Sequence, residues 1–231
     1  MKILISGASK GLGRTLTQHF GSQKNDLILI ASSMNQLADL KQEKELEFPI
    51  DVQIISADLS QKAEREKCLN QIDADSIDVL INNVGLYAED NPSTLNLEQL
   101  DELLELNLKS AIELTQAVIP SFKKRKQGQI ITINSVMGKT ASEQATSYSI
   151  SKHALKAWTD GLREELRPYQ IKVCNLYPGA INTSSWDGID VNRNQMIQKE
   201  DLANLIESIL KMGPSTLVEE VVLSPLNFET N

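Results

Sequence analysis

Tyr148 and Lys152 stand four residues apart in the segment SYSISK (147–152), and their spacing suggests chemistry. In a helix, two residues at this spacing share one face. A tyrosine normally keeps its proton up to pH ~10. A nearby cation favours the phenolate, so the lysine would make this phenol a better proton donor and acceptor near neutral pH. The alternative is an ordinary surface tyrosine beside an ordinary surface lysine, because this spacing is common in proteins.

Three glycines, Gly7, Gly11 and Gly13, fall in the segment SGASKGLG (6–13). Their spacing differs from Gly-x-Gly-x-x-Gly, and the segment lacks the Gly-Lys-Ser/Thr end of a P-loop. Glycines nevertheless let a backbone turn tightly and approach a pyrophosphate, and a following helix presents free N–H groups at its positive end. The segment therefore predicts a phosphate-binding turn, with a plain strand-to-helix turn as the alternative.

The elements that must position these residues alternate along the chain between short apolar runs and longer amphipathic stretches. We expect strands at 2–6, 27–31, 52–57, 77–82, 128–134, 171–177 and 218–223, and helices at about 11–23, 34–46, 60–73, 98–126, 147–167 and 199–212. This alternation is typical of βαβ units and a parallel sheet. Several runs, such as 28–30 and 79–81, are continuously apolar, as in strands covered on both faces. The prediction is a single doubly wound α/β domain of the Rossmann type, spanning residues 1–231 with about seven strands.

Unusual residues gather directly after the predicted strands. They are the segments 6–13, 32–33 and 82–85, together with Asp58, Ser135 and the pair Pro178–Gly179. In doubly wound sheets, ligands bind beyond the carboxyl ends of the strands, near the point where the strand order reverses. The candidate site is therefore expected at this edge of the sheet.

Composition excludes several classes of function. Hydrophobic residues make up 41% and charged residues 23% of the 231 residues, as in ordinary globular domains. The net charge of −8 argues against general nucleic-acid binding, which uses dense basic patches. The one basic run, 123–126, is expected to be a solvated helix C-terminus, with a phosphate or partner patch as the alternative.

No metal site or membrane attachment is expected. Two isolated cysteines, Cys68 and Cys174, make neither a disulfide framework nor a metal site, and Cys174 is interpreted as a small core residue. The apolar segment at the N-terminus is too short for a signal peptide, and no later run approaches the ~18 apolar residues of a membrane span. These features predict a soluble, cytoplasmic protein.

Taken together and in order, the motifs resemble the short-chain dehydrogenase/reductase family over nearly the whole chain. SGASKGLG resembles the cofactor turn of the family, ADLS (57–60) its adenine-contacting segment, and YPGAINT (177–183) its segment after the sixth strand. NNVG (82–85) resembles its Asn-Asn-Ala-Gly segment, with Val84 in place of the usual alanine. The resemblance implies an NAD(P)-dependent oxidoreductase. The cofactor-binding residues it implies are Gly7, Ser9, Lys10, Gly11, Leu12, Gly13, Ser32, Ser33, Asp58, Leu59, Asn83, Val84, Gly85, Tyr148, Lys152, Pro178, Gly179, Ile181 and Thr183.

The resemblance also implies a catalytic set of Asn107, Ser135, Tyr148 and Lys152. Tyr148 would act as the general acid or base and Ser135 would stabilise the developing charge on the carbonyl oxygen. Lys152 would favour the phenolate and bond the nicotinamide ribose. Asn107 would sit at a local break of its helix that holds a proton-relaying water; taken alone, it could equally be an exposed helical asparagine.

The second predicted strand ends in IASSMNQ (30–36), without the acidic residue that usually bonds the ribose 2′-hydroxyl of NAD. Ser32 and Ser33 could instead bond a 2′-phosphate, and Lys10 could supply charge. The arginine that many NADP-preferring relatives carry is missing. We therefore expect NADP as the cofactor, with NAD as the second choice.

The substrate is expected to be a small carbonyl or alcohol compound, bound under a variable loop at 180–198. That loop contains Trp186 and Arg193, and Met137 and Gly138 are expected to line the pocket.

Relatives associate through their two long helices and their C-terminal strand, which implies a homodimer or homotetramer. One rival is a non-catalytic NADP-binding redox sensor or regulatory protein. The other is a Ser–Lys hydrolase, which would leave the glycine turn unexplained and lacks a Gly-x-Ser-x-Gly elbow.

Overall fold

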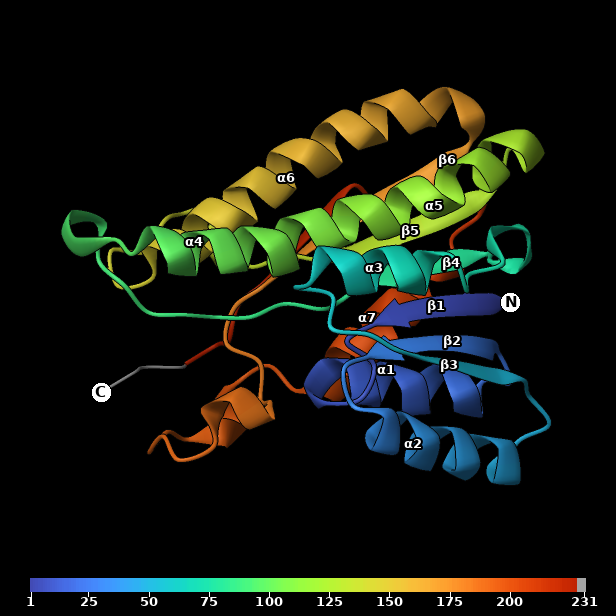
Figure 1. Ribbon diagram of the computed structural model, residues 1–231, viewed down its shortest axis with the longest axis horizontal. Coiled ribbons are helices and arrows are strands. Elements are labelled where there is room, and N and C mark those ends of the chain that lie inside the picture. Colours follow the sequence, from blue (N-terminus) through green and yellow to red (C-terminus); the bar gives the residue numbers. More distant parts are fainter. Residues whose placement is uncertain (228–231) are drawn as a thin grey trace.

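The computed structural model describes residues 1–227 and is built around one seven-stranded sheet (Figure 1). Its strands are β1 (Lys2–Ser6), β2 (Asp26–Ala31), β3 (Val52–Ser56), β4 (Val79–Asn82), β5 (Gly128–Ile133), β6 (Ile171–Pro178) and β7 (Glu220–Leu223). The strand order is β3-β2-β1-β4-β5-β6-β7, and every neighbouring pair is parallel. The order reverses between β1 and β4, where ligands bind in such sheets. This confirms the predicted doubly wound fold.

Helices cover both faces of the sheet. They are α1 (Gly11–Ser22), α2 (Met34–Glu47), α3 (Lys62–Leu69), α4 (Leu97–Leu104), α5 (Ser110–Arg125), α6 (Thr146–Leu166) and α7 (Lys199–Leu210). Side chains of β1 alternate between two buried clusters, with Ile3 and Ile5 in the one beside α1, α2 and α7 and Leu4 in the one beside α3, α5 and α6. Successive residues of a strand point to opposite faces. The continuously apolar runs therefore mark strands with a hydrophobic layer on each side.

Two predicted helices differ from the structure. The stretch predicted as one helix at 98–126 is divided into α4, a π-helical turn η3 (Glu105–Lys109) and α5. The helix predicted at 60–73 is only Lys62–Leu69, because Asp73 accepts a hydrogen bond from the backbone N–H of Asp75 and begins a separate 3₁₀ turn, η1 (Ala74–Ser76). Pieces of π-helix often occur at functional positions.

The basic run 123–126 forms the C-terminus of α5, as expected. Lys126 ends the helix in the left-handed region at φ 53°, Lys123 pairs with Glu165 at 2.7 Å, and Arg125 donates to the carbonyl oxygens of Asp75 and Ile77. Lys123 and Arg125 therefore connect the end of α5 to α6 and to the turn η1.

Both cysteines are buried and free, and burial raises the pKa of the Cys68 thiol to about 11 and of the Cys174 thiol to about 12. Neither thiol is a reactive thiolate at neutral pH. Within residues 1–227, no three His, Cys, Asp or Glu side chains gather so that they could hold a metal ion. No helix in this part of the chain has the length and apolar character needed to cross a bilayer.

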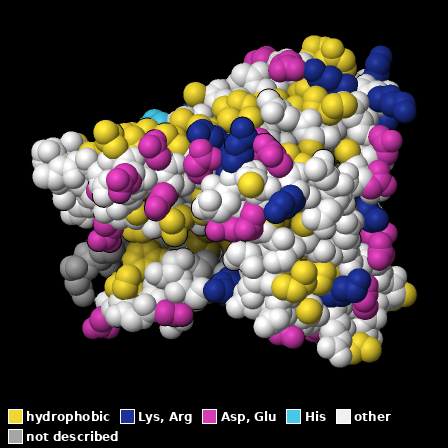
Figure 2. Space-filling view, viewed as in Figure 1, with side chains coloured by type: hydrophobic (Ala, Val, Ile, Leu, Met, Phe, Trp, Pro, Cys, Tyr) yellow, Lys and Arg dark blue, Asp and Glu magenta, His cyan; other side chains and the backbone are white. Residues whose placement is uncertain are grey.

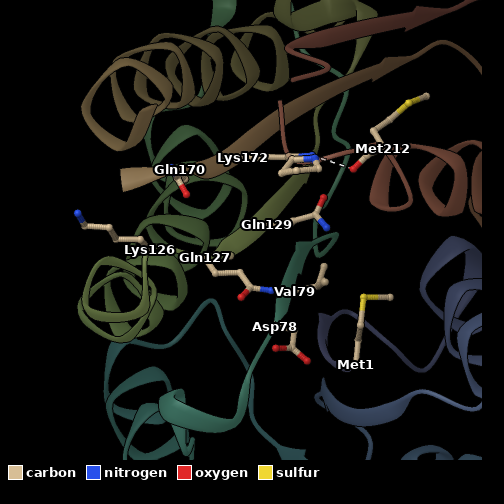
Figure 3. Close-up of a pocket in the computed structure, with 11 residues that line it drawn as sticks. Met1, Asp78, Val79, Lys126, Gln127, Gln129, Gln170, Lys172 and Met212 are labelled. Carbon is tan, nitrogen blue, oxygen red and sulfur yellow. Dashed lines mark hydrogen bonds between the residues drawn. The ribbon is translucent and has the colours of Figure 1, made fainter. Parts of the chain in front are cut away.

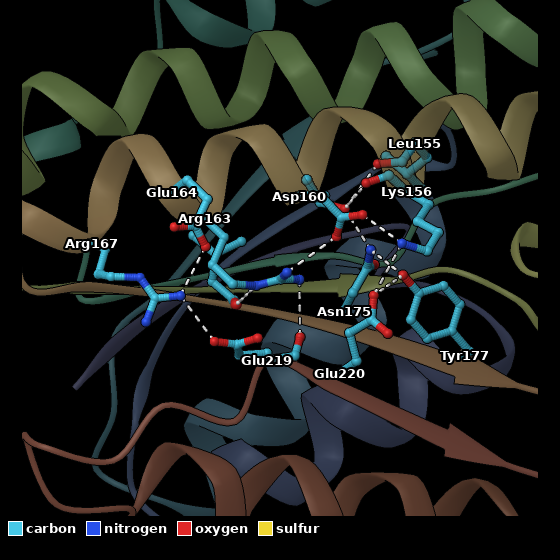
Figure 4. A network of polar contacts seen from close by, with 12 residues as sticks. Leu155, Lys156, Asp160, Arg163, Glu164, Arg167, Asn175, Tyr177, Glu219 and Glu220 are labelled. Atoms are coloured by element: carbon cyan, nitrogen blue, oxygen red, sulfur yellow. Dashed lines mark hydrogen bonds and ion pairs between the residues drawn. The ribbon is translucent and has the colours of Figure 1, made fainter.

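A polar network ties α6 to the last two strands (Figure 4). Arg163 of α6 donates to the carbonyl oxygens of Val173 and Glu219, each at 3.1 Å. Glu220 of β7 accepts from the Tyr177 hydroxyl at 2.9 Å and pairs with Lys156 of α6 at 3.4 Å. Buried polar groups with satisfied partners favour one arrangement over others. The network therefore fixes α6, whose first turns carry Tyr148 and Lys152, against the sheet.

Candidate active site

The turn between β1 and α1 depends on its glycines. Gly7 (φ 66°) and Gly11 (φ 50°) adopt left-handed backbone conformations that other residues rarely occupy. A Cβ on Gly13 would lie 1.9 Å from the carbonyl oxygen of Gly7, so only glycine fits there. Asn83, after β4, donates through Nδ2 to the carbonyl oxygens of Ser6 at 2.9 Å and Gly7 at 3.2 Å. The turn is thereby clamped to the end of the neighbouring strand.

The N-terminus of α1 is open to an anion. Lys10, at its N-cap, makes no side-chain capping hydrogen bond, and the first turn contains no acidic residue. The first N–H groups of a helix have no partner within it and carry partial positive charge. Thr183 lies across the turn, with its Cγ2 3.5 Å from where a Cβ on Gly11 would sit. The residues of this turn therefore fit the pyrophosphate of a dinucleotide.

Folding brings the four predicted catalytic residues together beyond the ends of β4 and β5. The Ser135 hydroxyl lies close enough to the Tyr148 hydroxyl to lower the pKa of the phenol, and Lys152 Nζ lies 5.7 Å from the centre of the Tyr148 ring. A Cβ on Gly85 would lie 3.4 Å from Asn107 Oδ1 and 3.5 Å from Lys152 Nζ. Gly85 therefore leaves open the space that these two polar groups border.

Burial controls the ionisation of the tyrosine and the lysine. Although part of the Tyr148 side chain is exposed, desolvation by the surrounding protein raises its pKa to about 12, against the opposing effect of the nearby Ser135 hydroxyl. Burial lowers the pKa of Lys152 to about 8, and its Nζ donates to the carbonyl oxygen of Ile133 at 3.1 Å. The sequence suggests a phenol whose pKa is lowered by the neighbouring cation, whereas in the structure burial has the largest effect on the pKa of Tyr148. A protonated Tyr148 is the form that can donate a proton.

Asn107 lies in the π-helical turn η3 and is buried, so it is not an exposed helical asparagine. Its Oδ1 accepts from the backbone N–H of Leu86 at 2.7 Å, and its Nδ2 donates to the carbonyl oxygen of Leu86 at 2.9 Å. The same Nδ2 donates to Ser151 Oγ at 3.0 Å. The expected local break is therefore present, and it joins the loop after β4 to α6.

Three residues that support the site are absent from the sequence-based set. Asn134 accepts through Oδ1 from the backbone N–H of Ser135 at 2.9 Å and donates through Nδ2 to the carbonyl oxygen of Lys152 at 3.2 Å. Asp90 accepts from the backbone N–H of Ser147 at 3.0 Å, at the start of α6. Asn134 stands directly before Ser135, a position that could have signalled its role, whereas nothing local marks Asp90.

Arg65 is the third of these residues, and it is fully buried. It donates to the carbonyl oxygen of Leu59 at 2.9 Å and pairs with Glu105 at 2.6 Å and Glu113 at 3.0 Å. Leu59 belongs to the predicted adenine segment and Glu105 to the π-helical turn. This arginine therefore links the two parts of the site.

The residues expected near the adenosine end lie at the ends of β2 and β3. Asp58 is exposed, and its Oδ1 accepts from the backbone N–H of Ser60 at 3.0 Å and from its hydroxyl at 2.7 Å. Ser33 caps α2 by accepting from the backbone N–H of Gln36, while Ser32 and Lys10 are exposed. Ser32 and Lys10 are thus accessible to a ligand at this end.

The predicted substrate loop, 180–198, is irregular apart from the short 3₁₀ turns η6 (Ser184–Trp186) and η7 (Arg193–Gln195). Arg193 pairs with Asp187 at 2.8 Å and donates to the carbonyl oxygen of Thr183 at 3.1 Å. Arg193 is therefore engaged within the loop. Of the two residues expected to line the pocket, Met137 is partly exposed and Gly138 is buried against Asn134.

A cavity of about 580 Å³ lies at the opposite ends of the strands (Figure 3). Its lining includes Met1, Asp78, Gln129 and Lys172, and Lys172 Nζ donates to the carbonyl oxygen of Met212 at 3.0 Å. Because it opens at the amino ends of β4, β5 and β6, it is separate from the catalytic residues, and we assign it no part in the candidate site.

Comparisons with known proteins identify relatives of this chain. The family described as short chain dehydrogenase matches residues 1–194. An uncharacterized oxidoreductase of Staphylococcus epidermidis is 25% identical over 96% of both chains, and the dehydrogenase/reductase SDR family protein 7-like of Drosophila melanogaster is 30% identical over 95% of this chain and 72% of its own.

Solved structures show the same fold. An alcohol dehydrogenase from the archaeon Thermococcus sibiricus, complexed with 5-hydroxy-NADP, superimposes with a TM-score of 0.90 at 22% identity, covering 100% of this chain and 98% of that one. A short-chain dehydrogenase from Sphingobium yanoikuyae in complex with NADPH has a TM-score of 0.84 at 26% identity, covering 97% of this chain and 87% of that one.

Proposed function

The chain belongs to the short-chain dehydrogenase family of NAD(P)-dependent oxidoreductases, and from this premise we propose that it interconverts a carbonyl group and a secondary alcohol with NADP(H). The observation that carries the proposal is the meeting of Ser135, Tyr148 and Lys152 at the end of the sheet where the glycine turn lies. Small-molecule substrates of doubly wound folds bind at this edge.

When bound, the reduced nicotinamide supplies a hydride, which carries the two electrons that reduce the carbonyl carbon. Tyr148 donates its phenolic proton to the carbonyl oxygen, and the product is a secondary alcohol. Ser135 donates a hydrogen bond to the same oxygen and stabilises its developing charge. Lys152 stabilises the phenolate left on Tyr148, which then regains its proton from solvent. In the reverse direction Tyr148 accepts the proton of the alcohol.

The residues proposed to hold the cofactor follow the edge of the sheet. The glycine turn 6–13 would hold the pyrophosphate, and Asp58 with Leu59 would contact adenine. The segment 83–85 and Lys152 would contact the nicotinamide half, together with Pro178, Gly179, Ile181 and Thr183.

We further propose that residues 1–231 form a single domain with 180–198 as its substrate loop. The assembly would be a homodimer or homotetramer, which a mass measurement in solution tests.

A screen of ketones and aldehydes for NADPH oxidation tests the proposed function. We expect at least one carbonyl compound to be reduced, because the protonated Tyr148 can donate a proton and the Ser135 hydroxyl lies beside it. Absorbance at 340 nm reports the reaction. NADPH binding without reduction of any compound would instead favour a redox sensor, and lack of NADPH and NADH binding would overturn the assignment.

The preference for NADP over NAD depends in the proposal on Lys10, with Ser32 and Ser33. Lys10→Ala is expected to raise KM for NADPH about fivefold and to leave KM for NADH nearly unchanged, because one charged hydrogen bond contributes ~1 kcal/mol or more. Initial rates with both cofactors measure this. Lys124→Ala, an exposed lysine at the far end of α5, is the matched control. A wild-type kcat/KM that favours NADH would contradict the preference.

A further inference from the structure

Tyr87 lies against the proposed catalytic tyrosine. Its ring meets the Tyr148 ring edge to face, with centroids 5.1 Å apart and planes at 69°. Tyr87 is 47% exposed and the adjacent Leu86 is 48% exposed. Aromatic rings of this kind offer hydrophobic contact area and a preferred geometry to a third ring. Leu86 and the Tyr87 ring therefore place exposed hydrophobic surface beside the proposed catalytic tyrosine.

The segment that carries Tyr87 is held on both sides. Asn107 binds both backbone groups of Leu86, and Asp90 accepts from Ser147 at the start of α6. The backbone N–H of Asp90 also donates to the carbonyl oxygen of Gln144 at 3.1 Å. A surface fixed in advance loses less conformational entropy when a ligand binds. Tyr87 is thus positioned as a wall of the site before a substrate arrives.

The molecule is hollowed at this edge of the sheet. Figure 2 shows hydrophobic side chains in a hollow between the region of α4 and the segment around 184–195. The loop 180–198 also carries an exposed hydrophobic residue, Ile189, which is 52% exposed. An apolar pocket with few polar groups is typical of sites for hydrophobic small molecules.

The segments that border the site carry an excess of negative charge. In the ranges 86–96, 136–146 and 180–198, the acidic residues are Glu89, Asp90, Glu143, Asp187 and Asp190, and the basic residues are Lys139 and Arg193. Both cations are paired with carboxylates, Lys139 with Glu220 at 2.5 Å and Arg193 with Asp187 at 2.8 Å. Apart from the buried Lys152, the charges that border the site are therefore mostly negative and would oppose an incoming anion.

We infer that the substrate is an uncharged carbonyl compound with a hydrophobic ring, that Tyr87 packs against this ring, and that the acidic border disfavours carboxylate- or phosphate-bearing substrates. This inference rests on the proposed function and specifies the substrate class of the same site.

Two compounds of nearly equal shape test the charge requirement. 4-Acetylbenzamide is uncharged and 4-acetylbenzoate is anionic at pH 7, and both present the same ketone on the same ring. We expect kcat/KM for the benzamide to exceed that for the benzoate at least about tenfold at ~10 mM salt. The ratio should shrink towards ~0.5 M salt, because screening shortens the range of the field.

Variants separate the two parts of the inference. Tyr87→Ala is expected to raise KM for 4-acetylbenzamide about tenfold with a smaller change in kcat, whereas Tyr87→Phe keeps the ring and should preserve KM.

The double variant Glu143→Gln/Asp190→Asn should lower the ratio of kcat/KM for the benzamide to that for the benzoate about threefold. The matched pair Asp39→Asn/Glu66→Gln, on the distant helices α2 and α3, should leave the ratio at its wild-type value.

The outcomes distinguish this inference from the proposed function. Equal or faster reduction of the benzoate would overturn the substrate class while leaving carbonyl reduction intact. Reduction of other ketones, but not of the benzamide, would do the same. An unchanged KM in Tyr87→Ala would overturn the role of Tyr87. Only failure of the whole carbonyl screen would overturn the proposed function as well.

Discussion

Replacing Tyr148 with phenylalanine is expected to lower kcat for carbonyl reduction by about 10²–10⁴-fold, the usual contribution of a positioned general acid. The substitution removes only the hydroxyl that lies near Ser135, and it keeps the ring that meets Tyr87 edge to face. The glycine turn is untouched, so the Kd for NADPH should stay within about twofold of the wild-type value. Steady-state rates and fluorescence titration with NADPH measure the two effects.

Tyr169→Phe is the matched control for this variant. Tyr169 is 37% exposed, lies beyond the far end of α6, and stacks with Lys123. Its hydroxyl should be irrelevant to turnover. If Tyr148→Phe turned over as fast as the wild type, the assignment of Tyr148 as the proton donor would be wrong.

The central strands could be predicted well because they are buried on both faces, whereas the edge strands β3 and β7 are partly exposed. Runs such as Leu27–Ile30 contribute alternately to the two buried clusters, so nearly every residue in them must be apolar. The position of the site followed from topology, since parallel strands end at one edge. Sequence alone therefore predicts that the motif residues lie together, without knowledge of their contacts.

The break in the helix predicted at 98–126 could not be located from local sequence. Asparagine is a poor helix former, but a π-helical turn at Asn107 depends on contacts with Leu86 and Ser151, which are far away in the chain. The supporting roles of Arg65 and Asp90 could not be predicted for the same reason. Each is a common surface residue type whose role arises from partners on other elements.

The ionisation of Tyr148 and Lys152 was the other property that sequence could not supply. The spacing of these two residues suggests a cation acting on a phenol, and the structure does place their side chains close together. The dominant effect is instead the removal of both groups from water, which acts in opposite directions on the two pKa values. The extent of burial depends on packing between α6, β5 and the loop after β4, which no local motif encodes.

Replacing Lys152 with methionine is expected to stabilise the protein at pH 7 by about 2 kcal/mol, while greatly reducing turnover. Burial lowers the pKa of Lys152 from 10.5 to about 8, so the unfolded chain holds more protons between these pH values. The free energy of unfolding of the wild type should therefore rise from pH 8 to 10.5. Below pH 8 the buried ammonium lowers the stability of the wild type by its full cost, about 3 kcal/mol. Methionine removes this cost but also removes the hydrogen bond to Ile133, which is a loss of about 1 kcal/mol.

Urea unfolding of the wild type and of Lys152→Met at several pH values between 7 and 10.5 measures this difference. The methionine variant should be the more stable at pH 7, and its advantage should fall as the pH rises, because the neutral lysine costs far less to bury. Lys124→Met changes an exposed lysine and should show no such trend. A difference between wild type and Lys152→Met that did not vary with pH would mean that Lys152 is not a desolvated cation. A desolvated ammonium that lowers stability is retained only if it serves function, as in other active sites that sacrifice stability for activity.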